Sequence, residues 1–495
     1  MKNFISEDVI PVLLIPSPIT GKNFYLMLEK LGFKEFHLNN GTLMNIERQA
    51  EALFKIFYMA GYLEPQRLWQ DINHIPSIED KKQIFISLAT AITKANGYKG
   101  EYGKFNSEAL IKELGNVHLS VDNWADLLLY ISQNAFNRKL NQERNELIKE
   151  DWMGFYAKEY MEEAKALGLT EEKKPTAIKY EEAWLAGASR VGILARLHYY
   201  KYLLDSSKIE IINHEVQVLA GHRELWANID GLSPLAKKVL ETTNIININE
   251  IDMSVPAGDY RDVTLEGKEY MFTLARDKGI KLDDQQSFIE YLKDDQNIPK
   301  GRAAGRTYVN YAKEETKKLT ESLLAQDILN KYFKSESNII DTAGSVPGSY
   351  SATDTRSNTY STGLDAANNL VDRILAANSD QREYYILYVS NNPYIERQAL
   401  ATQLVVNKVL KTKGLDELGY KIIIEGVGFS HKQDVVTIHS ELAALNSEKW
   451  RYYHQDWTED QLGILKDLMF QTRDNSYFNE EMPKFDVEVE IVGNV

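Results

Sequence analysis

The 495-residue chain carries a formal net charge of -15, which argues against a general nucleic-acid-binding protein because binding to a phosphate backbone needs a basic surface. Hydrophobic residues make up 43% of the chain, with 28 Tyr and 17 Phe, so there is enough apolar material for folded cores. The length predicts two domains, or else three. The absence of cysteine excludes disulfides, thiolate metal sites and cysteine nucleophiles.

The first residues predict neither a secretory signal nor a membrane anchor. Glu7 and Asp8 stand where a signal peptide needs basic charge, and Pro11 interrupts the short apolar run 9–15. No segment approaches the ~20 apolar residues that a membrane span requires. We therefore expect a cytoplasmic protein, or one delivered into a host cytosol, with no membrane span.

Residues 1–170 predict an α-helical N-terminal domain. Apolar residues recur at three- and four-residue spacing over 43–57, and Gly61 is placed to end that helix. Helix-capping signals precede two further apolar series, at 77–92 and 120–131. No His, Asp or Glu here has the spacing of metal ligands. This part of the chain is therefore typical of an interaction or cap domain, and a protein partner would bind through it.

The charged, proline-bearing segment 170–176 marks the expected domain boundary. Beyond it, strand-like and helix-like stretches alternate, which predicts an α/β domain over 177–495 with a doubly wound, mostly parallel, Rossmann-like sheet. The expected strands are 180–186, 215–220, 384–389 and 420–425, and the expected helices include 191–204 and 396–411.

Two further segments of this domain have features of their own. The region 231–305 is expected to be an insertion, and the basic stretch 300–306 at its end is either a lid or a solvated loop. The tail 485–492 alternates strictly between apolar and polar residues, which predicts a late edge strand.

Loops that follow parallel strands meet at one edge of the sheet, where ligands bind, and four such loops carry an arginine. In the first, Gly187 and Ala188 precede Arg190 at a helix start, where backbone N–H groups can hold an anion. Small residues at such a turn are also explained by packing alone. The pattern is neither a dinucleotide fingerprint nor a P-loop.

The second loop contains Gly221, His222 and Arg223. Glycine lets a ligand approach the backbone, arginine offers a planar two-point donor, and histidine titrates near neutral pH. The alternative is that Arg223 and Glu224 form a surface ion pair at the start of a helix.

The third loop, 345–363, follows an expected strand at 337–341 and either binds a ligand or is an ordinary flexible loop. Its candidate donors are Arg356, Ser357, Asn358 and Thr359. In the fourth loop Asn391 lies in a turn, and Arg397 follows one helical turn later, as a ligand-binding or a helix-surface residue. His431, after the strand 420–425, is a lesser candidate base.

Motifs of several common enzyme classes are missing from the sequence. There is no HExxH pattern and no clustered carboxylate motif, so no metal site is predicted. There is also no GxSxG pattern, so the common serine hydrolase reaction has no support.

Taken in order, the segments 185–188, 219–223, 321–328, 354–359 and 389–397 resemble the domain-of-unknown-function family that includes the bacterial YdcF, SanA and ElyC proteins. The similarity covers roughly 178–440, without the inserted region. It implies a Rossmann-like fold and a nucleotide-type ligand, with S-adenosylmethionine suggested for one branch. Either Asp341 or Asp354 would correspond to the family's acidic residue.

Two functions follow as hypotheses. The first is an enzyme that acts on an anionic, nucleotide-like small molecule by transfer or hydrolysis. Its binding arginines would be Arg190, Arg223 and Arg397, and its catalytic residues would be Glu321 or Asp354 as the acid that orients a hydroxyl or takes a proton, with His222 as general acid–base. The second is a non-catalytic, metabolite-sensing or scaffold protein whose helical domain binds a protein partner.

Overall fold

The computed structural model describes residues 25–60, 149–213, 216–221, 321–329, 342–343, 359–377 and 379–456, and the single residues 125, 128, 129, 132 and 147. All of them belong to one compact unit, which comprises Tyr25–Ala60 and Ala125–Asp456. The expected insertion 231–305, the stretch 300–306 and the tail strand 485–492 lie outside the described residues. The expected division of the chain near residue 170 stays a prediction.

The centre of the described unit is a five-stranded sheet in which all neighbouring strands are parallel. In spatial order its strands are β7 (Thr342–Ala343), β6 (Val216–Leu219), β4 (Glu182–Ala186), β8 (Glu383–Asn391) and β9 (Lys421–Phe429). In the register of the sheet, Leu185 of β4 pairs with Val218 on one side and Val389 on the other. The predicted α/β class with a parallel sheet is confirmed.

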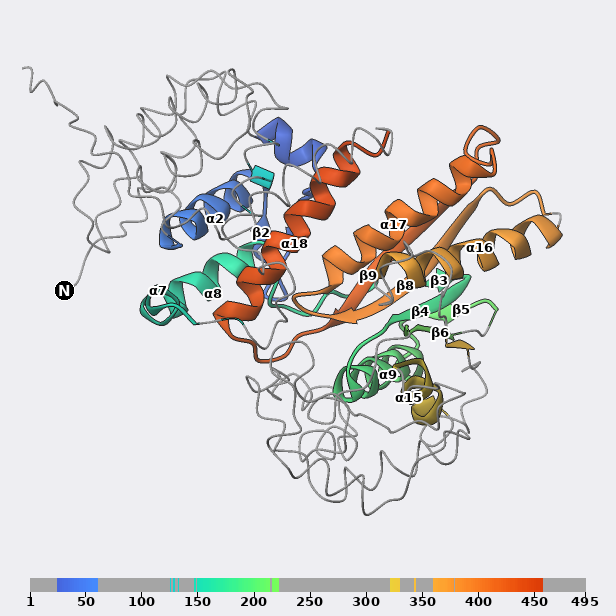
Figure 1. Cartoon of the computed structure of the whole chain (residues 1–495), viewed down its shortest axis with the longest axis horizontal. Coiled ribbons are helices and arrows are strands. Elements are labelled where there is room, and N and C mark those ends of the chain that lie inside the picture. The colour runs from blue at the N-terminus through green and yellow to red at the C-terminus, as the bar shows by residue number, and fades with distance from the viewer. Residues whose placement is uncertain are drawn as a thin grey trace, which may run out of the picture. The chain divides into compact units, whose positions relative to one another are not determined.

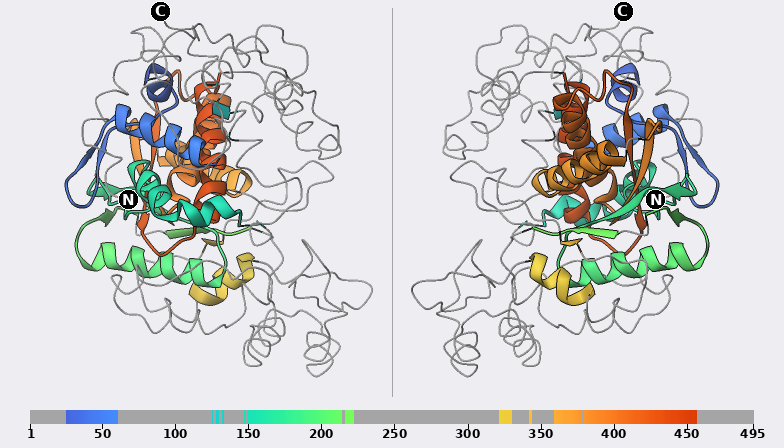
Figure 2. Two further views of the ribbon diagram at one scale, coloured as in Figure 1. Left: turned by 90° about the vertical axis from the view of Figure 1, so that its left-hand side faces the viewer. Right: turned by 90° about the vertical axis from the view of Figure 1, so that its right-hand side faces the viewer.

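Helices cover both faces of this sheet (Figures 1 and 2). α9 (Arg190–Asp205) and α15 (Glu321–Ile328) pack on one face, and α16 (Thr359–Ala377) and α17 (Ile395–Thr412) pack on the other. Because side chains alternate along a strand, Leu185 joins the first core and Trp184 the second, and both are fully buried. Each such side chain stabilises the fold by roughly 1.5–3 kcal/mol.

One expected loop is in part a helix. The sequence places Thr359 in a Ser/Thr-rich loop that extends to residue 363, but α16 begins at Thr359. The physical reason lies further along the helix, where apolar residues recur at helical spacing and pack on the sheet. These residues are Ala366, Ala367, Leu370, Val371 and Ile374.

The predicted N-terminal helix over 43–57 is confirmed from residue 46 as α2 (Ile46–Met59), but residues 43 and 44 form a strand, so this part of the chain is not purely helical. It follows a short antiparallel pair, β1 (Phe36–His37) and β2 (Leu43–Met44), and packs on α8 (Ala157–Ala166). α7 (Asp151–Phe155) precedes α8, and the last described helix, α18 (Val435–Tyr453), packs against both α8 and α17. In the part of the chain that the structure describes, no helix is both long and apolar enough to cross a membrane.

The segment between α8 and the sheet is held by hydrogen bonds to β9. The backbone of Lys173 pairs with that of Gly428 in both directions, with N–O distances of 2.9 Å. Further on, the Glu425 carboxylate accepts hydrogen bonds from the backbone N and the hydroxyl of Thr176. A short parallel pair, β3 (Lys179–Tyr180) with β5 (Glu210–Ile211), lies beyond it. The charged segment 170–176 therefore follows a defined path along the end of β9.

Candidate functional site

The carboxyl ends of the strands form the candidate site. From β4 the chain passes through α9 to β6 on one side, whereas β8 and β9 lie on the other side of β4. The connections that follow β4 and β8 therefore leave the sheet in opposite directions. In parallel α/β sheets, ligands bind where the strand order reverses in this way.

The loop after β4 is tightly packed at Gly187. A Cβ atom on this residue would lie 2.3 Å from Oε1 of Glu321 and 2.5 Å from the carbonyl oxygen of Leu219, so only glycine fits. The Gly187 N–H donates to that same carbonyl over 3.1 Å. The loop is thereby held against β6 and α15, and it brings the predicted residues Gly187 and Glu321 together.

The amino end of α9 follows directly. Ser189 is its N-cap, and its side chain forms no capping hydrogen bond. The first N–H groups of a helix have no acceptor within that helix, and they carry partial positive charge that favours an anion. Ala188 and Ser189 are half-buried, whereas Arg190, the first residue of α9, is fully buried.

Arg196 joins the ends of two strands, although the sequence did not single it out. Its Nη1 donates to the carbonyl oxygens of Ala186, over 2.6 Å, and of Gly187, over 2.8 Å. Its Nε donates to Oδ1 of Asn391 at the end of β8, over 3.0 Å. The side chain is 3% exposed, so a buried guanidinium ties the loop after β4 to the end of β8.

Asn391 extends this network to His431. The Asn391 amide nitrogen lies 2.9 Å from Nε2 of His431, and Nδ1 of His431 lies 2.8 Å from the carbonyl oxygen of Lys432. A carbonyl only accepts, so Nδ1 carries the proton and Nε2 accepts from the amide. His431 is therefore a neutral, hydrogen-bonded ring in this arrangement, and it positions Asn391.

Burial dominates the electrostatics of Arg196. Desolvation lowers the pKa of Arg196 to about 10, although Tyr388, Tyr394 and Glu321 favour its charged form. The guanidinium remains charged near neutral pH. The strand ends thus hold a fixed positive charge next to the loop after β4.

Arg397 lies in the first turn of α17 and forms an ion pair with Glu441 of α18 through its Nε. Burial would lower the pKa of Arg397, but the charge of Glu441 and its hydrogen bond raise it above the usual value. The Arg397 side chain is 18% exposed and that of Glu441 1%. In the structure, Arg397 therefore connects α17 to α18.

Some of the other predicted site residues lie in the described part of the chain, and the rest lie outside it. Gly221 is buried just after β6, Glu321 is buried at the start of α15, and Thr359 begins α16. Six predicted residues lie outside the described residues: His222, Arg223, Asp354, Arg356, Ser357 and Asn358. Convergence of the four predicted arginines therefore stays a prediction. Among the residues that the structure does describe, no group of three or more His, Asp or Glu could hold a metal ion.

Comparison of the chain with protein-family models, with curated proteins and with solved structures found no match. The resemblance to the YdcF, SanA and ElyC family accordingly stays a prediction from the sequence. The functional argument depends on the geometry of the strand ends.

Proposed function

We propose that this protein binds an anionic small molecule of nucleotide type at the carboxyl ends of β4 and β8. The observation that carries the proposal is the spatial order β7-β6-β4-β8-β9. Counted along the chain within this sheet, it is the order three-two-one-four-five of doubly wound, Rossmann-like sheets, which bind nucleotides where the order reverses.

Two local features support the same position. The amino end of α9 offers N–H groups beside a loop whose glycine is required by packing, as an anion site needs. The buried guanidinium of Arg196 adds positive charge and holds the ends of β4 and β8 in register through Asn391. An anion placed at the loop after β4 would therefore meet a preorganised, positively polarised surface.

Transfer or hydrolysis is the chemistry that we propose for the bound ligand, and S-adenosylmethionine is one candidate cofactor. The buried Glu321 carboxylate, which lies against Gly187, is positioned to orient a ligand hydroxyl or to take its proton. His222 and Asp354, the other proposed catalytic residues, lie outside the described part of the chain.

The test is a thermal-shift screen with nucleotides, nucleotide sugars, phosphorylated metabolites and S-adenosylmethionine. A ligand at about 100 times its dissociation constant stabilises the folded protein by roughly 2.7 kcal/mol, which raises the melting temperature by several degrees. A screen in which no ligand shifts the transition would contradict the proposal and favour a partner-binding scaffold.

Ser189 offers a matched pair of variants that locates the site. Both Ser189→Asp and Ser189→Asn supply a good N-cap, so neither should destabilise the protein. They differ by one negative charge, which at about 6 Å from a bound anion weakens binding by roughly 1–3 kcal/mol. We expect affinity to fall 10- to 100-fold in Ser189→Asp and to change little in Ser189→Asn. Equal affinities would place the ligand elsewhere.

A further inference from the structure

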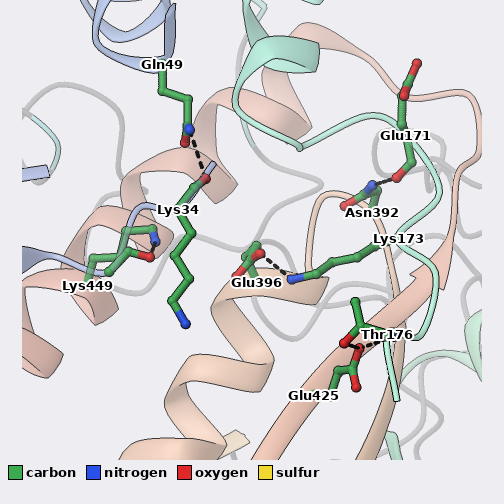
Figure 3. A network of polar contacts seen from close by, with 10 residues as sticks. Lys34, Gln49, Glu171, Lys173, Thr176, Asn392, Glu396, Glu425 and Lys449 are labelled. Carbon is green, nitrogen blue, oxygen red and sulfur yellow. Dashed lines mark hydrogen bonds and ion pairs between the residues drawn. The ribbon is translucent and has the colours of Figure 1, made fainter. Parts of the chain in front are cut away.

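Three lysines from separate segments lie near Glu396, and one of them, Lys173, contacts its carboxylate, as Figure 3 shows. Lys34 belongs to the loop that precedes β1, Lys173 to the segment between α8 and β3, and Lys449 to α18. Glu396 lies in the first turn of α17. We name Lys34, Lys173, Lys449 and Glu396 the lysine cluster.

The backbone holds Lys173 and Lys34 in place. Lys173 pairs through its main chain with Gly428 at the end of β9, and its amine forms an ion pair with Glu396. The carbonyl oxygen of Lys34 accepts a hydrogen bond from Nε2 of Gln49, over 2.9 Å. Lys34 is exposed, and the side chains of Lys173 and Glu396 are 41% and 38% exposed. Solvent therefore reaches the cluster from this side.

Lys449 forms the buried side of the cluster. It is 5% exposed, and its amine donates to the carbonyl oxygen of Gly32 over 3.1 Å. The same amine lies over the ring of Phe33, 4.1 Å from its centroid. A positive charge is thus fixed behind the two accessible lysines.

The charges of the cluster do not balance. Within the described residues, the ammonium groups of these three lysines act electrostatically on one carboxylate, so two positive charges are in excess. The lysines act on this carboxylate together: Lys173 lowers the pKa of Glu396 to about 2 with help from Lys449 and Lys34, against the effect of burial. Burial lowers the pKa of Lys449 to about 8, which Glu396 opposes and Lys173 and Lys34 reinforce.

Neighbouring charged groups leave this excess in place. Arg397 is neutralised by Glu441, and Glu171 pairs with Lys165. The cluster also lies at the amino end of α17, a helix of 18 residues whose first N–H groups have no acceptor within the helix. The helix dipole adds to the positive potential there.

We propose that the lysine cluster is a second anion-binding site, which holds a doubly charged phosphate group of a small molecule between Lys34 and Lys173. Two excess positive charges match a phosphate dianion better than a carboxylate, and ammonium groups bind phosphate as point charges. The cluster shares no residue with the loop after β4 or with α9, so this proposal goes beyond the proposed function and does not depend on it.

The test is a calorimetric titration with inorganic pyrophosphate, in the full-length Ser189→Asp protein so that binding at the first site is weakened. Lys34→Gln removes one exposed charge of the cluster and should weaken pyrophosphate binding about tenfold. Lys158→Gln removes an exposed charge on α8, outside the cluster, and should leave the affinity unchanged. Acetate should not compete, because it carries a single charge.

Glu396→Gln separates a binding site from an internal ion-pair network. The variant removes the carboxylate that competes with a bound phosphate, so we expect pyrophosphate affinity to rise several-fold while the melting temperature falls. A fall in melting temperature without tighter binding would overturn the proposal. The proposal would also be overturned if the Ser189→Asp protein did not bind pyrophosphate, or if adding Lys34→Gln to it left the pyrophosphate affinity unchanged. If the wild-type protein bound pyrophosphate but the Ser189→Asp protein did not, the site at the amino end of α9 would be supported and the lysine cluster would not.

Discussion

Replacement of Arg196 by methionine should destabilise the protein by about 3 kcal/mol. In the wild type, the guanidinium donates to the carbonyl oxygens of Ala186 and Gly187 and to Oδ1 of Asn391, over 2.6–3.0 Å. Methionine keeps an apolar stem but leaves these three oxygens without that donor. A buried acceptor without a donor costs about 1–3 kcal/mol, so three cost roughly 6 kcal/mol. Burial lowers the pKa of Arg196 to about 10, and the loss of this desolvated charge returns roughly 3 kcal/mol.

The assay is thermal and urea unfolding of the wild type, Arg196→Met and Arg196→Lys. A loss of about 3 kcal/mol lowers the melting temperature by roughly 4 °C in a unit of this size. Lysine should be no better than methionine, because its compact ammonium cannot reach acceptors on two strands at once. A lysine variant with wild-type stability, or a loss below about 1 kcal/mol for methionine, would refute the role assigned to Arg196.

Two further predictions concern packing and pH. A Cβ atom on Gly428 would lie 2.2 Å from the carbonyl oxygen of Ser390, so Gly428→Ala should cost at least about 2 kcal/mol in urea unfolding. The control is Gly154→Ala in α7, where a Cβ atom would lie 4.0 Å from Cε of Lys149, an ordinary contact, so this variant should stabilise the protein by up to about 1 kcal/mol. Similar free energies of unfolding for the two variants would contradict the crowding at Gly428. Burial lowers the pKa of His439 to about 3 from 6.5, so the unfolded chain takes up a proton that the folded protein does not, and stability falls as the pH drops through this window. Between pH 8 and pH 5 the wild type should lose about 2 kcal/mol more than His439→Phe, and parallel pH profiles would show that the histidine is not held neutral.

The strands and helices of the sheet were predictable because both faces are buried. β4 and β8 are nearly continuous apolar runs, and the helices α9 and α17 follow each of them after a short polar turn. Such runs bounded by turns are typical of parallel strands, and their alternation with helices indicates the α/β class. The strand order, in contrast, depends on long-range pairing and needed the structure.

Arg196 was missed because a single arginine within a helix is usually a surface residue. A signal was present nonetheless, since its neighbours Ile193, Leu194 and Leu197 are apolar and leave α9 with little polar face. A helix that is apolar nearly all round is buried, and a charge on it needs internal partners. Those partners, however, come from two strands about 200 positions apart in the sequence.

Arg397 has a partner that the sequence did not indicate. Its place one turn after β8 predicted either a ligand-binding or a helix-surface residue, and in the structure its guanidinium reaches Glu441 on α18. Glu441 follows Ile438 and precedes Leu442 in a buried stretch, and a buried acid usually indicates an ion-pair partner. The sequence could not show that this partner is Arg397, because the two helices meet only once the sheet is formed.

The most direct test of the central claim is hydrogen–deuterium exchange of the wild-type protein with and without the strongest ligand of the screen. If the ligand lies where the strand order reverses, exchange should slow in peptides that cover 186–197 and 389–394. Exchange in α2, which packs on α8, should stay unchanged. Protection confined to other segments, or none at all, would contradict a ligand site at the ends of β4 and β8.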